Sequence, residues 1–256
     1  MRKKRFCMSR PTDLRENRLL AALPQEDVAR LLPHLEPVTW SLRTVLYEPD
    51  YAPAFLYFPT TAMVSLNSTP ASGPTAATSI VGCEGVVGVA LVMGGASTLS
   101  QAMVQMAGGG FRLPAAVGHT GFERGGAFQA ALLRYTQALL TQTAQTAVCN
   151  RMHAIEQRLC RWLLLIHDRV PTKERPITKE FLAQMLAVRP EGLTRVARDL
   201  HNASMIRCGQ GHITIVDRRA LEARVCECYK AVQNEFPRLL GWVGLGRRHS
   251  PKAKVG

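Results

Sequence analysis

The chain has 256 residues, 46% of them hydrophobic, with a formal net charge of +13 and an isoelectric point near 9.9. This length predicts about two domains of ~100–200 residues each, and the composition excludes an intrinsically disordered chain. The basic charge favours a polyanionic partner. No segment approaches the ~18 uninterrupted apolar residues of a membrane span, and no apolar run follows the basic start MRKKRFCMSR as it would in a signal peptide. We therefore expect a cytoplasmic protein with no membrane partner.

Charge is distributed unevenly along the chain. Residues 51–150 contain only five charged side chains, whereas residues 151–230 contain fifteen Lys and Arg against nine Asp and Glu, a difference of +6. An uncharged middle followed by a basic module is typical of a sensing or scaffolding domain joined to a nucleic-acid-binding one. For the basic ends, MRKKR and RRHSPKAK, the alternative is solvated tails on an ordinary globular protein.

The first half of the chain predicts short helices and then short strands. Residues 15–35 read as helices interrupted by Pro24 and Pro33. From about Val38 to Leu113, brief β-type runs alternate with Pro, Gly, Ser and Asn. The runs are SLRTVLY, AFLYF, AMVSL, ATSIVG, GVVGVALVM, AMVQMA and FRL. Many short strands with Gly-rich turns predict an antiparallel barrel or sandwich.

Helical periodicity returns near Gly126. Residues 127–151 lack Pro and Gly and predict one long helix with a broad apolar stripe, which either packs on its own barrel or pairs with its copy in a homodimer. We favour pairing. A second helix is expected at residues 155–167, with His153 and His167 on helices and either exposed to solvent or satisfied structurally.

The stretch ITKEFLAQMLAVRPEGLTRVARDLHN, residues 177–202, has the spacing of a helix-turn-helix. Thr178 can cap the first helix, Ala183 is small where the helices approach, and Pro190 suits the first turn of the second helix. The second helix is expected to bury Leu193, Val196, Ala197 and Leu200 and to expose Glu191, Arg195, Arg198 and Asn202. Arg can bind a guanine edge bidentately and Glu can accept a hydrogen bond from cytosine. Two such helices also occur in protein cores, so periodicity alone leaves both interpretations open.

The segment MIRCGQGHITIV follows the helix-turn-helix. It predicts two strands joined at Gly209–Gly211, a hairpin that would form a wing beside the recognition helix. A helical bundle would not need this hairpin, so the order favours a winged DNA-binding module.

Metal and catalytic motifs are not recognisable. The seven cysteines contain no CxxC pair, and their odd number favours a reducing compartment. Cys226 and Cys228 form a CxC on a predicted helix, where alternate residues face different ways, so we expect packing or no role. No Ser/His/Asp, Cys/His or paired-carboxylate arrangement stands out, so we predict no metal, no cofactor and no enzyme. Glu84, nearly alone in an apolar stretch, is interpreted as a solvated turn carboxylate, with contact to an effector or opposing subunit as the alternative.

The order of barrel, long helix and winged helix-turn-helix resembles the Crp/Fnr family of bacterial transcription regulators over residues 18–230. The supporting motifs are ITKEFLAQMLAVRPEGLTRVARDL for the DNA module and GCEGVVGVALVMGG followed by SQAMVQ for the barrel. RYTQALLTQTAQTAVCNR and RLCRWLLL resemble the family's dimer helix and the helix after it. The resemblance implies an α+β fold with an N-terminal antiparallel β-roll or barrel and flanking helices, a long dimerisation helix and a C-terminal winged helix-turn-helix.

The resemblance also implies roles for residues of the DNA module. Glu191 and Arg195 match positions that read bases, Pro190 stands where Arg is usual, and Ala187 stands at a turn position that is often Gly. The full set of expected DNA-binding residues is Thr178, Lys179, Arg189, Pro190, Glu191, Thr194, Arg195, Arg198, Arg207 and His212. The implied partners are double-stranded DNA, a second copy of the chain and RNA polymerase.

The effector pocket departs from the family's cyclic-nucleotide pattern. Val89 stands where a Glu holds the ribose, and Ser100 where an Arg holds the phosphate. A buried phosphate without a cationic partner is costly, so we expect no ordinary cAMP binding. The effector is unidentified, and the candidate pocket comprises Glu84, Gly85, Gly88, Val89, Ser100 and Gln101.

The predicted domains are a flexible basic segment at 1–17, a barrel at 18–125, a dimerisation helix at 126–152, a winged helix-turn-helix at 153–228 and a basic tail at 229–256. The predicted function is that of a homodimeric, sequence-specific DNA-binding transcription regulator. The alternative is a ligand-gated protein-interaction module that does not act by reading DNA. The charge of the exposed recognition face distinguishes the two, and Arg195 with Arg198 favours DNA.

Overall fold

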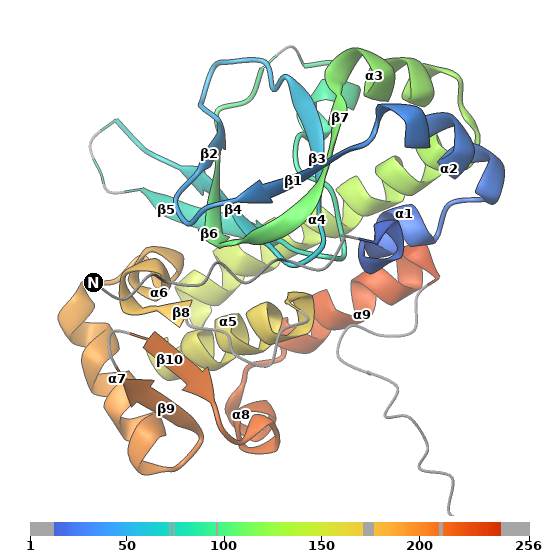
Figure 1. Cartoon of the computed structure of the whole chain (residues 1–256). Helices are drawn as coiled ribbons and strands as arrows, with labels where there is room; N and C mark the ends of the chain where they lie inside the picture. Colours follow the sequence, from blue (N-terminus) through green and yellow to red (C-terminus); the bar gives the residue numbers. More distant parts are fainter. Residues whose placement is uncertain are drawn as a thin grey trace, which may run out of the picture.

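The computed structural model describes residues 13–71, 73, 75–95, 97–170, 177–209 and 212–241 (Figure 1). The strands are β1 Glu36–Trp40, β2 Val45–Tyr47, β3 Phe55–Pro59, β4 Met63–Ser68, β5 Ala76–Val81, β6 Gln101–Met106, β7 Gly108–Pro114, β8 Ile177–Thr178, β9 Ile206–Gly209 and β10 His212–Ile215. The α-helices are α1 Arg18–Ala21, α2 Gln25–Leu31, α3 Ala115–Glu123, α4 Gly126–Met152, α5 Ile155–Arg169, α6 Lys179–Leu186, α7 Pro190–Asn202, α8 Arg218–Arg224 and α9 Cys228–Leu240. Short 3₁₀ helices are η1 Leu14–Glu16, η2 Leu32–His34 and η3 Val89–Val92.

The predicted antiparallel barrel is present as two sheets. One has the order β1-β7-β3 and the other β2-β6-β4-β5, and all their pairings are antiparallel. Leu56, Phe58, Val64 and Val104 are completely buried between them. Figure 1 shows α4 running beneath this barrel and the small sheet β8-β10-β9 at the opposite end of the molecule.

One predicted strand is wrong. The run GVVGVALVM does not form a strand, because Gly88 adopts a left-handed conformation with φ +101 and starts η3. Val86 and Val87 are buried before this turn, with a single bridge between Val87 and Tyr57. A left-handed residue ends an extended run, and Gly permits it at little cost.

The expected terminal tails are also partly wrong. Within the segment expected to be flexible, Asn17 is completely buried and its Nδ2 donates to the carbonyls of Pro59 and Gly85, each at 2.8 Å. At the other end, residues expected to be a basic tail form α9, which buries Tyr229, Val232 and Phe236. The apolar residues recur at helical spacing and find a surface on α4, which explains the helix.

The long helix α4 is confirmed, and it is covered on more than one side. Its buried side chains contact the barrel and α9, and Tyr135 lies 6.1 Å from Phe236 between ring centroids. A further face is exposed at residues 133, 137, 140, 144, 147 and 151. These positions alternate by four and three residues, as in a helix-pairing seam. Within the described residues, no helix combines the length and apolar character needed to span a membrane.

Candidate DNA-binding interface

The helix-turn-helix forms as the sequence predicts. Thr178 caps α6, with its Oγ1 accepting a hydrogen bond from the Phe181 amide at 3.2 Å. Ala187 ends α6 in a left-handed conformation with φ +48, which explains why glycine would suit this turn. Arg189 is extended and α7 begins at Pro190, whose missing N–H falls among the amides that a helix start leaves unpaired.

The two helices are held by apolar contacts. Leu193, Ala197 and Leu200 of α7 are at most 1% exposed, and Val196 is half-buried. Leu182 and Leu186 of α6 are completely buried, and Ala183 is 7% exposed. Both helices also contact α5, so the DNA module rests on the helix that follows α4.

The opposite face of α7 is exposed and polar. Glu191, Arg195, Arg198 and Asn202 are exposed there as predicted, and Thr194 is exposed beside them. Within the described residues, neither Arg195 nor Arg198 forms an ion pair. In Figure 1, α7 lies at the outer edge of the molecule, away from the barrel. Two guanidinium groups on a protruding helix can therefore reach an outside partner.

A three-stranded wing lies beside α7. β10 pairs with β9 from His212–Gly209 to Ile215–Ile206, and it also pairs with β8. Arg207 is exposed on β9, while His212 is half-buried and its Nδ1 has no hydrogen-bond partner among the described residues. The predicted tip of the hairpin, residues 210–211, lies outside the described residues.

The remaining predicted DNA contacts lie at the two helix starts. Thr178 and Lys179 are half-buried at the N-terminus of α6, and Arg189 is exposed directly before α7. Helix N-termini attract anions, because unpaired amides and the helix dipole point outward there. The hydroxyl of Thr178 accepts from Phe181 and can still donate to a phosphate oxygen.

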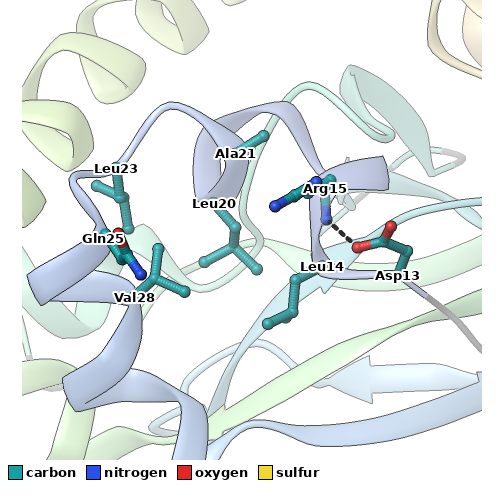
Figure 2. Close-up of a pocket in the computed structure, with 8 residues that line it drawn as sticks. All are labelled: Asp13, Leu14, Arg15, Leu20, Ala21, Leu23, Gln25 and Val28. Carbon is teal, nitrogen blue, oxygen red and sulfur yellow. Dashed lines mark hydrogen bonds between the residues drawn. The ribbon is translucent and has the colours of Figure 1, made fainter.

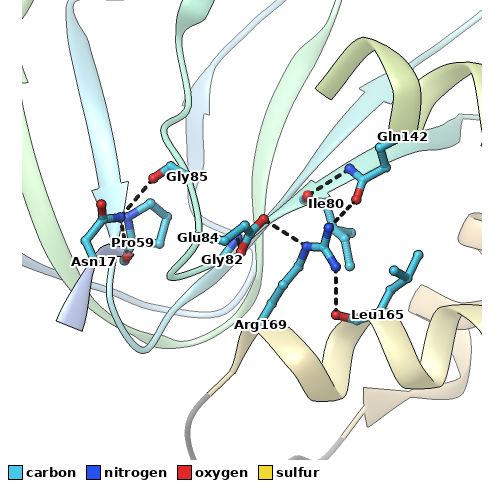
Figure 3. Close-up of polar contacts among 9 residues, drawn as sticks. All are labelled: Asn17, Pro59, Ile80, Gly82, Glu84, Gly85, Gln142, Leu165 and Arg169. Carbon is cyan, nitrogen blue, oxygen red and sulfur yellow. Dashed lines mark hydrogen bonds and ion pairs between the residues drawn. The ribbon is translucent and has the colours of Figure 1, made fainter. Parts of the chain in front are cut away.

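Glu84 requires a correction. Instead of being solvated, it is completely buried, and its Oε1 accepts from Arg169 Nε at 2.8 Å (Figure 3). Its Oε2 accepts from the Gly82 amide at 3.0 Å. Arg169 also donates to Gln142 Oε1 of α4 at 2.6 Å and to the Leu165 carbonyl at 3.1 Å. This buried ion pair therefore joins the barrel, α4 and α5.

The other residues of the candidate effector pocket do not surround one described cavity. Gly85 lies against Tyr135, because a Cβ there would be 2.2 Å from that ring, and Gly88 and Val89 start η3. Ser100 precedes β6, and the side-chain Nε2 of Gln101 donates to Glu48 Oε2 at 2.8 Å. A cavity of about 410 Å³ lies elsewhere, among the N-terminal helices and lined by residues such as Leu14, Leu20 and Val28 (Figure 2).

A groove of about 440 Å³ separates the barrel from the helix-turn-helix. It is lined by Thr75 and Ala76 of the β5 end and by Ala183, Val188 and Arg189 of the DNA module. The barrel and the helix-turn-helix thus face each other across this groove.

Sequence reasoning missed a cluster of three cysteines and a histidine. Cys149 lies in the last turn of α4 and His153 directly follows that helix, whereas Cys226 lies in the turn before α9 and Cys228 is the first residue of α9. The CxC is therefore not inside a helix, and both thiols face the same way. The hydrogen bond between the Cys149 and Cys226 thiols lowers the pKa of Cys226 to about 6 and raises that of Cys149.

Three comparisons with known proteins address the class of this protein. Residues 157–224 match the Crp-like helix-turn-helix domain, whereas no curated protein sequence matches the chain. Among solved structures, FixK2 from Bradyrhizobium japonicum has a TM-score of 0.65 at 14% identity, covering 75% of this chain and 98% of FixK2. A putative Crp/Fnr regulator from Eubacterium rectale has a TM-score of 0.60 at 16% identity, covering 82% and 98%. The c-di-GMP responsive global regulator CLP from Xanthomonas campestris has a TM-score of 0.58 at 15% identity, and the match covers 75% of this chain and 99% of CLP.

Fold and site together define a winged helix-turn-helix protein with an N-terminal double-sheet barrel. The resemblance to the Crp/Fnr family is confirmed: the chain carries a Crp-like helix-turn-helix domain in the fold of the Crp/Fnr regulators.

Proposed function

We propose that the chain is a homodimeric, sequence-specific DNA-binding transcription regulator of the Crp/Fnr type. The observation that carries this proposal is the exposed face of α7, where Arg195 and Arg198 stand on a Crp-like module. Arg195 would bind a guanine edge, with Arg198 reading a neighbouring position, and Glu191 would accept from cytosine N4. Thr194 lies on the same face, and Pro190, the first residue of α7, would also lie at the DNA.

Phosphate contacts would hold this helix in the major groove. Thr178, Lys179 and Arg189 lie at helix starts, while Arg207 and His212 lie on the wing. Such contacts set the position of the protein without specifying sequence. RNA polymerase would be a further partner, and the protein would act in the cytoplasm.

The exposed face of α4 supports the homodimer. Leu133 is 46% exposed, Leu140 63% and Val148 48%, although each is apolar. A row of exposed apolar side chains on a 27-residue helix favours pairing with an identical helix. Two copies of α7 would then face two half-sites of one operator.

The barrel would not bind cAMP in the usual way. Val89 stands at the start of η3, Ser100 precedes β6, and neither offers the carboxylate or guanidinium that the ligand needs.

The first experiment is selection of bound sites from a random DNA library by the full chain, without nucleotide, with cAMP and with cyclic di-GMP. We expect an enriched two-fold motif that is the same with and without cAMP. Failure to enrich any two-fold motif under all three conditions would overturn the proposal in favour of the protein-interaction module.

The second experiment tests base reading by Arg195. Arg195→Ala should weaken binding to the selected site by about 1–3 kcal/mol, or about 5–150-fold, and relax preference at one base pair. Arg124→Ala is the charge-matched control, because Arg124 is exposed at the end of α3 on the barrel. Equal affinity of Arg195→Ala and the parent protein for selected and random DNA would contradict the assignment.

A further inference from the structure

The cysteine and histidine cluster brings together segments far apart in sequence. Cys149 and His153 come from the end of α4, and Cys226 and Cys228 from the turn that starts α9. The three cysteines are at most 3% exposed and form a group separate from the hydrophobic core, and the His153 side chain is 13% exposed. Apolar packing alone does not require three buried thiols next to one imidazole, and all four groups are metal ligands.

The distances fit four ligands of one metal ion. The four ligand atoms lie within 4.8 Å of one another, with Cys149 Sγ 3.6 Å from Cys226 Sγ and Cys228 Sγ 3.7 Å from His153 Nδ1. A tetrahedral zinc with Zn–S near 2.3 Å and Zn–N near 2.0–2.1 Å places two sulfurs about 3.8 Å apart and a sulfur and nitrogen about 3.6 Å apart. The Cys149–Cys226 and Cys228–His153 separations match these values, and the other separations between ligand atoms are at most 4.8 Å.

The imidazole is already oriented for this role. His153 Nε2 lies 3.2 Å from Glu227 Oε1, which leaves Nδ1 directed at the cysteines. A carboxylate on the far nitrogen of a metal-binding histidine fixes its tautomer and increases its basicity. Glu227 lies between Cys226 and Cys228, so one short turn supplies two ligands and the group that orients a third.

A buried cation provides an independent observation. Arg161 of α5 is completely buried, and its Nη2 donates to Thr146 Oγ1 at 3.0 Å. Its Nε and Nη1 have no hydrogen-bond partner in the part of the chain that the structure describes. Burial lowers the pKa of Arg161, and the charges of Cys149, Cys228 and Cys226 oppose that shift. A divalent ion on three thiolates and a neutral imidazole carries one net negative charge, which this guanidinium would balance.

We propose that Cys149, His153, Cys226 and Cys228 form a structural zinc site. Four protein ligands leave no open position for a substrate, so the site is structural rather than catalytic. Thiolate and imidazole donors in tetrahedral array select zinc among the common divalent ions. An iron–sulfur cluster does not fit, because it distributes its four protein ligands over two or more irons, so that not all four ligand atoms can lie as close together as the ligands of one ion. A Cys149–Cys226 disulfide would use two of the four groups and leave His153 and Cys228 without a role.

The site would join α9 to the junction of α4 and α5. His153 is the residue directly after α4, and α5 begins two residues later at Ile155. Bound zinc would fix this junction to the turn between α8 and α9. The DNA module and α4 would then be connected by metal–ligand bonds as well as by the chain.

The test is metal content of the untagged full chain, purified under reducing conditions. We expect about one zinc ion per chain by inductively coupled plasma mass spectrometry. After removal by chelator, cobalt should restore one ion per chain, with the ligand-field bands of tetrahedral Co(II) and a thiolate-to-cobalt charge-transfer band. This measurement uses the parent protein, so it does not depend on the folding of a variant, and without DNA it is independent of the proposed function.

Variants locate the ion. Cys226→Ser should weaken zinc binding at least about 100-fold, because loss of a ligand exceeds the about 10–100-fold typical of an outer partner. His153→Cys should retain cobalt with a stronger charge-transfer band. Cys208→Ser is the control, because Cys208 lies half-buried on β9 outside the cluster, and it should bind as the parent does.

Three results would overturn the proposal. They are a chain that takes up neither zinc nor cobalt, a protein with iron and inorganic sulfide at these cysteines, and a Cys149–Cys226 disulfide in protein kept under reducing conditions. Equal loss of metal in Cys208→Ser and Cys226→Ser would overturn the assigned ligands.

Discussion

Glu84 and Arg169 place two opposite charges in the interior, where neither has contact with water. Glu84→Gln would leave the guanidinium of Arg169 buried without its counter-charge. Removal of one partner of a buried pair typically costs about 3–5 kcal/mol. We expect the free energy of unfolding, measured by urea denaturation, to fall by about this amount.

The surface pair between Glu36 and Arg112 is the matched control. Its atoms are 2.7 Å apart, but the side chains are 50% and 39% exposed. Exposed pairs are worth about 0–1 kcal/mol, so Glu36→Gln should change the free energy of unfolding by no more than that. Equal losses of unfolding free energy in Glu84→Gln and Glu36→Gln would contradict a larger contribution from the buried pair.

Residue-scale prediction from sequence succeeded where local spacing decides the outcome. Thr178 as a cap and Leu193, Ala197 and Leu200 as buried positions follow from helical periodicity and are confirmed. Glu84 could not be placed correctly, because its partner lies 85 residues away. The cysteine cluster was missed for the same reason, since 77 residues separate Cys149 from Cys226.

At the scale of single elements, α6, α7 and the wing were predictable because each carries its own start and stop signals. α4 was equally clear, since no Pro or Gly interrupts it after Gly126. By contrast, β1 was missed because it begins with Glu36 and Pro37, which are depleted in strands, and leaves only Val38, Thr39 and Trp40 as strand formers. It forms as an edge strand through pairing with β7.

The exposed seam of α4 gives a prediction about assembly. In a symmetric helix pair, Leu140→Glu would bury a carboxylate near its own copy. The dissociation constant of the dimer should rise at least ten-fold, or about 1.4 kcal/mol, in sedimentation equilibrium. Leu42→Glu is the control, because Leu42 is 46% exposed in the barrel turn before β2 and should leave the dimer intact. An unchanged dimer in Leu140→Glu would place the interface elsewhere.

At the scale of the whole molecule, a two-fold dimer requires its two recognition helices to face one side of the DNA. Half-sites should therefore lie about one helical turn apart. Inserting about five base pairs between them, half a turn, should reduce affinity in fluorescence anisotropy to that of a single half-site. The same insertion outside the operator should have no effect. Affinity that does not depend on spacing would contradict binding as a two-fold dimer.

The order of the domains was predictable from the sequence, but the packing of the C-terminal helix α9 on α4 was not. The sequence indicates barrel, long helix and winged module, and the structure bears out that order. The sequence did not indicate that α9 packs across α4, because that contact depends on surfaces formed by distant segments. The apolar residues of α9 carry a helical pattern, yet nothing local shows which surface they cover.

The packing of α9 across α4 has a consequence for synthesis of the protein. Phe236 contacts Tyr135 of α4, and the guanidinium of Arg169 lies 5.3 Å from the Phe236 ring. Both contacts join α4 or α5 to a helix that is synthesised after them. The barrel and α4 can begin to fold during translation, but the apolar side of α4 that faces α9 stays uncovered until α9 has emerged from the ribosome. Packing around α4 is thus completed only by a segment made about 90 residues later.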